Sequence, residues 1–291
     1  MRPPWSKSLV AAGLALLVSV RAYAQPLFGH AESIECTVIN SDLVVVGRLV
    51  AFGGGGQADG REGHEATIAV EDILKGERHR RLRVHLSHPA SVLAAWKEQS
   101  RRLLVAAKED APDSATAIDL GDETLEVLRA DFTLLRDPEG VIRSAREAVR
   151  RMPAAVRRIH TFGLEVPREA IAGTEWEKYY ATGGKLILSV PVDVRLENRA
   201  HDYVRSESYP RRLAGAQALR YFKSDENIAR LRTLLVDPGW AYLHHAEQNQ
   251  GVEVRIYGIR REAYRTLRDW GVDAEEPVIR EEIGKPESVR P

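Results

Sequence analysis

The chain has 291 residues but only one cysteine, Cys36, so no disulfide can form within it. This excludes the class of small exported domains that are held together by disulfides. The thiol is either buried and inert or paired between chains. We favour burial, because a free thiol on the surface of an exported protein would be reactive.

The chain also has no excess of positive or negative charge. Basic and acidic residues each number 42, which gives a formal net charge of zero at pH 7. A chain of this kind is not attracted as a whole to nucleic acid or to an anionic membrane. Beyond the N-terminus, no segment is apolar over the length needed to cross a bilayer. We therefore expect no nucleic-acid partner and no stable membrane insertion of the mature protein.

Familiar catalytic motifs are missing as well. The chain has no Gly-x-Ser-x-Gly elbow and no Ser-x-x-Lys set. The "GGGG" at 53–56 is not followed by the Gly-Lys-Ser/Thr of a phosphate-binding loop. We identify no catalytic or cofactor-binding residue and expect a protein that is not an enzyme. A hydrolase with an unrecognised site is the alternative, because active sites are defined by geometry rather than by sequence order.

The histidines are too scattered for a metal site. His85 and His88 lie in "HLSH", and His244 and His245 have Glu247 close by, but zinc needs three or four converging ligands. The stretch "HEATI" begins like a zinc-protease helix without the second histidine. We expect no metal and no cofactor.

The N-terminus has the residue order expected of an export signal. Arg2 and Lys7 precede an apolar run at 9–20, and the small residues "AYA" stand directly before Gln25. This order is typical of a secretory signal peptide. An uncleaved anchor is the alternative, but the run is too short to span a bilayer comfortably. We expect residues 1–24 to be removed and the protein to be periplasmic or extracellular.

Residues 25–135 are predicted to form a small OB-like β-barrel. Aliphatic or alternating runs predict at least five strands, at 42–52, 67–75, 82–86, 103–107 and 128–134. One helix is expected among them at 91–99, and the glycine-rich residues 53–63 form the tip of a hairpin. Five strands with a single helix are typical of a small barrel.

Residues 136–206 are predicted to form an α/β connector. Asp137-Pro138-Glu139 is a helix start, and Pro153 stops that helix. The segments "IHTFGLEV" and "KLILSVPVD" are interpreted as paired strands. The arginines of "RSAREAVRRMPAAVRR" could meet an acidic partner, but we favour a solvated helix face, because acids are interspersed.

Residues 207–291 are predicted to form a HEAT-like helical unit. Two sets of four residues share their spacing at an offset of 49 positions: Arg211, Ala214, Ala218 and Tyr221, then Arg260, Ala263, Leu267 and Trp270. This offset is slightly longer than the roughly 40–47 residues of HEAT repeats. The additional residues lie in an inserted loop that contains Trp240 and Tyr242. Loop aromatics suit binding, but we favour packing over the helical stack. Chance periodicity is the alternative, because two repeats are few.

Two resemblances support this division. The stretches "SDLVVVGRLVAF", "ATIAVEDILKGE" and "RRLLVAAKE" resemble a pattern of exported bacterial proteins with an OB-type barrel of the netrin and tissue-metalloproteinase-inhibitor kind, over residues 33–135. In the animal inhibitors a disulfide-bonded N-terminal cysteine coordinates the protease zinc. Here Gln25 begins the mature chain and Cys36 has no partner, so the resemblance implies the fold and not the inhibition. Residues 207–272 are similar to HEAT repeats.

The sequence therefore predicts an α+β protein with an OB-like barrel, an α/β connector and a HEAT-like unit. Helical arrays present concave surfaces and OB barrels present a groove, and neither needs a cofactor. We expect an exported, non-catalytic protein-binding or scaffold protein whose partner is another protein. The alternatives are a hydrolase and a protease inhibitor that acts through the barrel loops.

Cleavage after Ala24 is the first testable prediction. Mass spectrometry of the protein from an envelope preparation should give an N-terminus at Gln25, in open or cyclised form. A mature chain that still starts at Met1 would contradict it.

Overall fold

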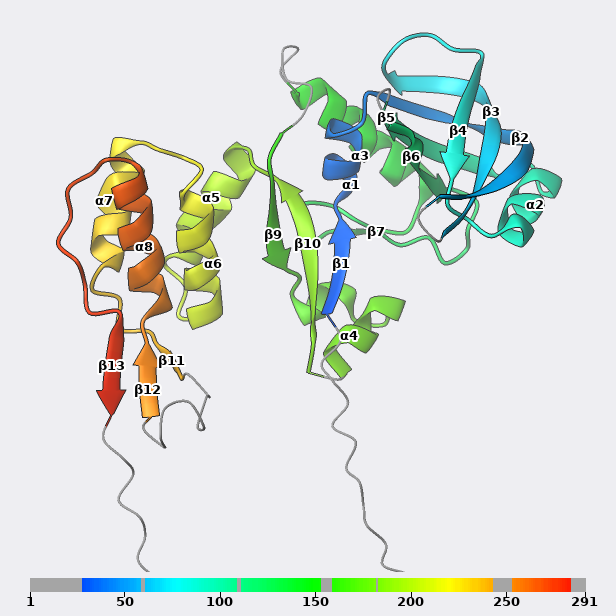
Figure 1. Ribbon diagram of the computed structural model, residues 1–291. Coiled ribbons are helices and arrows are strands. Elements are labelled where there is room, and N and C mark those ends of the chain that lie inside the picture. The colour runs from blue at the N-terminus through cyan, green and yellow to red at the C-terminus, as the bar shows by residue number, and fades with distance from the viewer. Residues whose placement is uncertain are drawn as a thin grey trace, which may run out of the picture.

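The computed structural model describes residues 28–58, 61–108, 111–152, 159–181, 183–242 and 253–283. Over these residues the protein is mixed α+β, with a closed five-stranded barrel and eight α-helices (Figure 1). No helix within them is both long and apolar enough to cross a membrane. The predicted leader lies outside the described residues.

The barrel closes in the strand order β2-β3-β4-β6-β5. Its strands are β2 (Leu43–Ala58), β3 (Arg61–Lys75), β4 (Arg81–Leu86), β5 (Arg102–Lys108) and β6 (Ala111–Asp119). Helix α2 (Ala90–Glu98) connects β4 to β5 and buries Leu93 and Trp96 against the barrel interior. The first four strands and the helix match the predicted segments, and the pairing of β2 with β3 as a hairpin is confirmed. The predicted tip at 53–63 is corrected, because residues 53–58 and 61–63 belong to the paired strands.

The fifth predicted strand, at 128–134, is wrong. Residues 127–135 instead form a tight hairpin of β7 (Val127–Leu128) and β8 (Leu134–Leu135). The side chain of Asp131 accepts a hydrogen bond from the Thr133 amide at 2.9 Å, and Phe132 adopts a positive φ of 70°. An Asp side chain that captures a backbone amide favours a turn over a strand. The apolar alternation in this stretch is divided between two strands, and β6 supplies the fifth barrel strand.

A second sheet, of order β1-β10-β9, stands beside the barrel (Figure 1). Strand β9 (Thr161–Glu165) pairs antiparallel with β10 (Lys185–Pro191), which confirms that these two segments pair. Strand β1 (Phe28–Glu32) pairs parallel with the other edge of β10. Residues 28–32, predicted as part of the barrel domain, therefore belong to the second sheet instead. Phe28 pairs with Lys185, which is 157 residues later in the sequence. The residues around Phe28 therefore contain no local pattern that predicts this parallel partner.

Helix α1 (Ile34–Ile39) leads from β1 to the barrel and packs against α3 (Pro138–Arg151). The predicted start of α3 is confirmed, because the Asp137 side chain accepts the Gly140 amide at 2.6 Å and Pro138 takes the first position. Short helical turns connect β9 to β10: η1 (Arg168–Ile171), η2 (Glu175–Glu177) and α4 (Lys178–Ala181).

Four helices form the C-terminal part, namely α5 (Val194–Tyr203), α6 (Tyr209–Leu219), α7 (Asp225–Leu234) and α8 (Gly258–Asp269). Helix α8 packs against both α6 and α7. Ser224 caps α7, and Gly271 follows α8 with a φ of 71°, as predicted. The predicted inserted loop contributes to a small sheet of β11 (Ala241–Tyr242), β12 (Glu253–Ile256) and β13 (Arg280–Ile283), which was not predicted.

The burial of α8 generates the second prediction. Ala263 and Leu267 are fully buried, whereas Arg265 is exposed. Leu267→Ala should lower the free energy of unfolding by roughly 2–5 kcal/mol, because it leaves a cavity. Ala263→Leu should cost roughly 1–3 kcal/mol by overpacking, and Arg265→Ala should stay within about 0.5 kcal/mol. Denaturant melts measure all three. Equal midpoints for Leu267→Ala and Arg265→Ala would overturn the packed-helix interpretation.

Candidate binding sites

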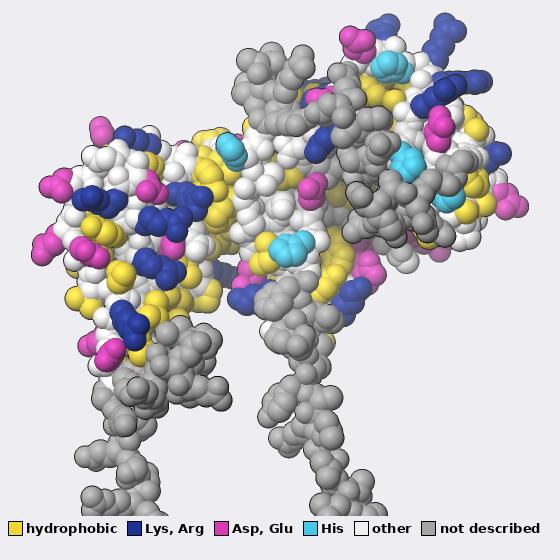
Figure 2. Space-filling model, viewed as in Figure 1, with side chains coloured by type: hydrophobic (Ala, Val, Ile, Leu, Met, Phe, Trp, Pro, Cys, Tyr) yellow, Lys and Arg dark blue, Asp and Glu magenta, His cyan; other side chains and the backbone are white. Residues whose placement is uncertain are grey.

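The structure does not bring the histidines together. His85 lies on β4, and His88 packs on Trp96 with ring centroids 4.8 Å apart, where burial lowers the pKa of His88. Figure 2 shows separate histidines dispersed over one face of the molecule. Within the described residues, no three His, Cys, Asp or Glu side chains are grouped as metal ligands would be. His244, His245 and Glu247 lie outside those residues.

Cys36 is fully buried in α1, which confirms the burial prediction. Burial raises the pKa of its thiol to about 12, the neighbouring Glu32, Glu35 and Asp193 charges add to this, and the hydrogen bond to Ser33 opposes it. A thiol with this pKa carries almost no thiolate near neutral pH and is a poor nucleophile.

The loop aromatics pack on one another. Trp240 meets Tyr242 edge to face at 4.5 Å, and the Arg255 guanidinium lies 4.7 Å from the Trp240 ring. Tyr242 keeps 44% of its surface exposed at β11. Tyr242 belongs to the small sheet, and Trp240 directly precedes it.

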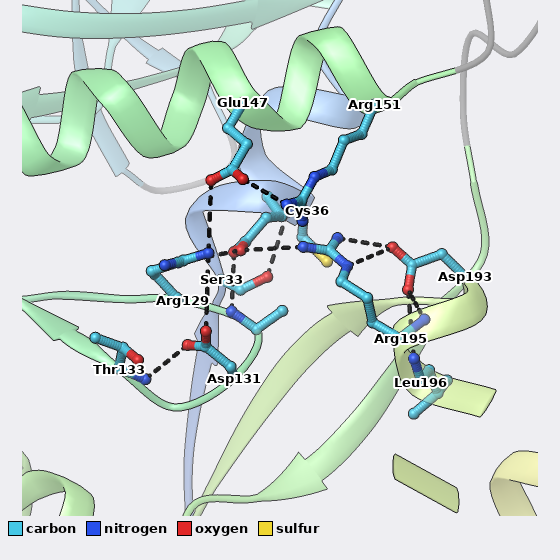
Figure 3. Close-up of polar contacts among 12 residues, drawn as sticks. Ser33, Cys36, Arg129, Asp131, Thr133, Glu147, Arg151, Asp193, Arg195 and Leu196 are labelled. Atoms are coloured by element: carbon cyan, nitrogen blue, oxygen red, sulfur yellow. Dashed lines mark hydrogen bonds and ion pairs between the residues drawn. The ribbon is translucent and has the colours of Figure 1, made fainter. Parts of the chain in front are cut away.

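The arginines of α3 lie on its outer face, as the solvated-face interpretation predicts. Arg146 pairs with Asp72 of β3, and Arg143 and Arg150 are exposed. Residues 153–158 of the same basic stretch lie outside the described residues. Arg151 differs from its neighbours, because its side chain reaches toward a cluster of charged groups between α1, α3 and α5 (Figure 3).

At the centre of this charged cluster is Glu35, which is only 2% exposed. Its carboxylate accepts the Ala130 amide at 2.9 Å and lies 3.6 Å from Arg129 Nε and 3.5 Å from Arg195 Nη1. These partners come from the β7–β8 turn and from the start of α5. The buried charge is therefore compensated by two segments that are remote in sequence.

Arg195 is itself held in a fork by Asp193, the residue that caps α5. Two nitrogens of its guanidinium donate to Asp193 Oδ2 at 2.9 and 2.7 Å, and Asp193 Oδ1 accepts the Arg195 amide. Burial alone would lower the pKa of Arg195, but Asp193 and Glu35 outweigh it and raise the pKa. The guanidinium is permanently charged and fixed in orientation.

A cavity of about 260 Å³ opens onto this cluster. Four arginines line it, namely Arg129, Arg151, Arg195 and Arg199. The remaining wall is formed by apolar side chains of β9, β10 and α5 and by Asp131 and Asp193. We call this the arginine cavity.

A second cavity, of about 440 Å³, lies between the sheet and α6. Gly163, Glu165 and Ile187 form its sheet wall, and Arg211 and Ala214 belong to its α6 wall. Figure 2 shows the surface hollowed between the helical part and the sheet. We call this the β9 groove.

The hydrogen-bond pattern of β9 leaves one edge of the strand unpaired, and two residues of that edge, Gly163 and Glu165, line this groove. Val166 donates to Leu186, and His160 accepts from Val192, so the even-numbered residues bond to β10. In an antiparallel pair the intervening residues point their amides and carbonyls away from the partner strand. Thr161, Gly163 and Glu165 therefore present an unpaired edge, for which the described residues provide no backbone partner.

No family model matches the chain, and no match is found among curated proteins or solved structures. The site assignments therefore rest on geometry. Sequence reasoning identified neither the arginine cavity nor the β9 groove. One local signal existed: a glutamate in the otherwise apolar helix "IECTVI" demands a buried cationic partner.

Glu35 provides the third prediction. Glu35→Ala should lower the free energy of unfolding by about 3 kcal/mol, at the low end for breaking a buried ion pair, because Arg129 and Arg195 remain partly solvated. Glu35→Gln keeps an acceptor for the Ala130 amide and should cost less. Urea denaturation measures both.

The matched control is Glu147→Ala, which removes a more exposed carboxylate from the same cluster and should cost less than about 1 kcal/mol. If Glu35→Ala and Glu147→Ala destabilise the protein equally, the buried carboxylate does not hold the cluster together.

Proposed function

We propose that this protein is an exported, non-catalytic binding protein that holds an extended segment of a partner protein along strand β9. The observation that carries the proposal is the unpaired outer edge of β9 in a groove. Export is supported by the charge, apolar run and "AYA" order of residues 1–24. No cofactor is required for such an activity.

Strand addition is a recurrent mode of peptide recognition in which main-chain hydrogen bonds supply affinity and neighbouring pockets supply specificity. The outward amides and carbonyls of Thr161, Gly163 and Glu165 would supply the main-chain bonds. Because Gly163 has no side chain, a second backbone can approach this edge closely. The α6 wall, with Pro210 and Leu213, would contact the side chains of the bound segment.

The groove also limits aggregation through the exposed edge of β9. Exposed sheet edges promote aggregation unless they are short, charged or covered. Strand β9 has only five residues, and Lys185 pairs with Glu165 at its end, at 2.6 Å. With α6 standing beside it, the edge is accessible to a narrow extended chain but not to a second sheet.

We also propose that the barrel is OB-like and that α6–α8 are HEAT-like. Support for the first is the strand order, in which the third and fifth barrel strands, β4 and β6, pair in parallel and a helix precedes the fourth. Support for the second is the equivalent placement of Ala218 in α6 and Leu267 in α8, both buried at the helix contact. In this arrangement the barrel and helices position the sheet between them.

The fourth prediction tests the β9 edge with a matched pair of variants. Peptides selected from a displayed random library on the protein comprising residues 25–291 should bind Glu165→Ala as they bind the wild type. Glu165→Pro should weaken them by about tenfold, since it removes one outward amide donor. Fluorescence anisotropy of labelled peptides gives the dissociation constants.

Both variants lose the Lys185 ion pair, so the comparison isolates the amide. Proline is tolerated on an edge strand where the amide faces outward, and thermal melts check that the two variants are equally folded. Selected peptides that bind Glu165→Pro and Glu165→Ala equally would refute strand addition, as would a selection that enriches no peptide.

A further inference from the structure

We infer that the arginine cavity binds a ligand with one carboxylate and an apolar body, through the guanidinium groups of Arg129 and Arg199. The cavity lies between the end of α3, the β7–β8 turn and the junction of β10 with α5 (Figure 3). Its volume of about 260 Å³ suits a group of the size of one amino-acid residue. This inference concerns a different site from the β9 groove.

Arg129 has unused hydrogen-bonding capacity. Its guanidinium lies 3.6 Å from Glu35 and 3.7 Å from both Asp131 and Glu147, too far in each case for a hydrogen bond. Its Nε is buried without any hydrogen-bond partner among the described residues. A buried donor without an acceptor is costly, and a carboxylate oxygen in the cavity would satisfy the guanidinium.

Arg199 is oriented but not neutralised by contact. It donates to the Ala130 carbonyl at 2.7 Å and stacks at 4.5 Å from the Phe132 ring. Among the described residues no carboxylate forms an ion pair with it. The positive φ of Phe132 places that ring under the guanidinium, so the turn that the sequence did not predict holds Arg199 at the cavity.

The two other arginines have different roles. Arg195 is occupied by the Asp193 fork and by Glu35, so it has little capacity for a ligand. Arg151 is half exposed and pairs with Glu147 through one nitrogen, which leaves further donors at the cavity mouth.

The charge balance limits the ligand to a single negative charge. Four carboxylates face the four arginines: Asp131 and Asp193 line the cavity, and Glu35 and Glu147 lie behind it. Partial burial acts to raise the pKa of Asp131, but hydrogen bonds from Thr133 and the charges of Arg129 and Arg199 outweigh it and lower that pKa. Asp131 therefore stays ionised at the cavity wall, and its negative charge repels a dianion more than a monoanion.

The rest of the cavity wall selects an apolar body. Leu164 of β9, Val190 of β10 and Leu196 of α5 are buried side chains that line it, together with Pro191. Apolar walls with a few convergent polar groups are typical of small-ligand sites. Two sources share the required chemistry: a free small carboxylic acid, and the C-terminal residue of a polypeptide.

Isothermal titration of the protein with N-acetyl-leucine, with a short peptide that ends in leucine, and with the amides of both compounds tests this inference. The acids should bind at least about tenfold more tightly than the amides, because the charge-assisted hydrogen bonds require a carboxylate. A peptide acid that binds more tightly than N-acetyl-leucine identifies a polypeptide C-terminus as the source, and the reverse order identifies a small acid.

Arg199→Gln should weaken acid binding about tenfold or more, and Arg151→Gln should weaken it by a smaller factor. The matched controls are Arg205→Gln, just beyond α5, and Arg150→Gln, the exposed neighbour of Arg151. Both controls should bind like the wild type. Arg151→Gln provides a second test if Arg199→Gln does not fold, because Arg151 contributes only an exposed ion pair to the structure.

Acids that bind no more tightly than their amides, or Arg199→Gln and Arg151→Gln proteins that bind like their controls, would overturn the inference. Glu165→Pro should leave acid binding unchanged, since Glu165 lies outside the arginine cavity. The experiments therefore distinguish a failure of the strand-addition proposal from a failure of the carboxylate-binding proposal.

Discussion

The buried carboxylate of Glu35 is the constraint on which the arrangement of the protein depends. A carboxylate that is almost completely buried needs compensation, and Glu35 obtains it from the Ala130 amide, Arg129 and Arg195. These contacts join α1, the β7–β8 turn and the junction of β10 with α5. The helix that leads into the barrel, the turn and the junction of sheet and helices are thereby connected through one carboxylate, and the cost of its desolvation is offset by several partners.

The same constraint produces the arginine cavity. Arg129 and Arg195 are drawn to Glu35, Asp193 fixes Arg195, and the turn that supplies Ala130 also supports Arg199. The arginines bring more hydrogen-bond donors to this cavity than the surrounding carboxylates accept. The network that compensates the buried carboxylate thus has donors left over for the carboxylate of a small ligand. The apolar wall beside them selects the body of that ligand.

The proposed functions use two properties of one small sheet. At the outer edge of β9 the recognition groups belong to the main chain, so strand addition tolerates many partner sequences. In the arginine cavity the recognition groups are guanidinium side chains, so the charge of the ligand decides binding. Both sites lie where the sheet meets the helices, the arginine cavity at α5 and the β9 groove at α6.

The sequence by itself determined the features that depend on neighbours in the chain. Apolar periodicity located most strands and helices, Asp137 and Ser224 marked helix starts, and the lone Cys36 excluded a disulfide. Tertiary structure alone decided the pairing of β1 with β10 and the contacts of Glu35 with residues 95 and 160 positions away. Periodicity and capping act over a few residues, whereas the partner of a buried charge or of a parallel strand is set by the packing of the whole chain.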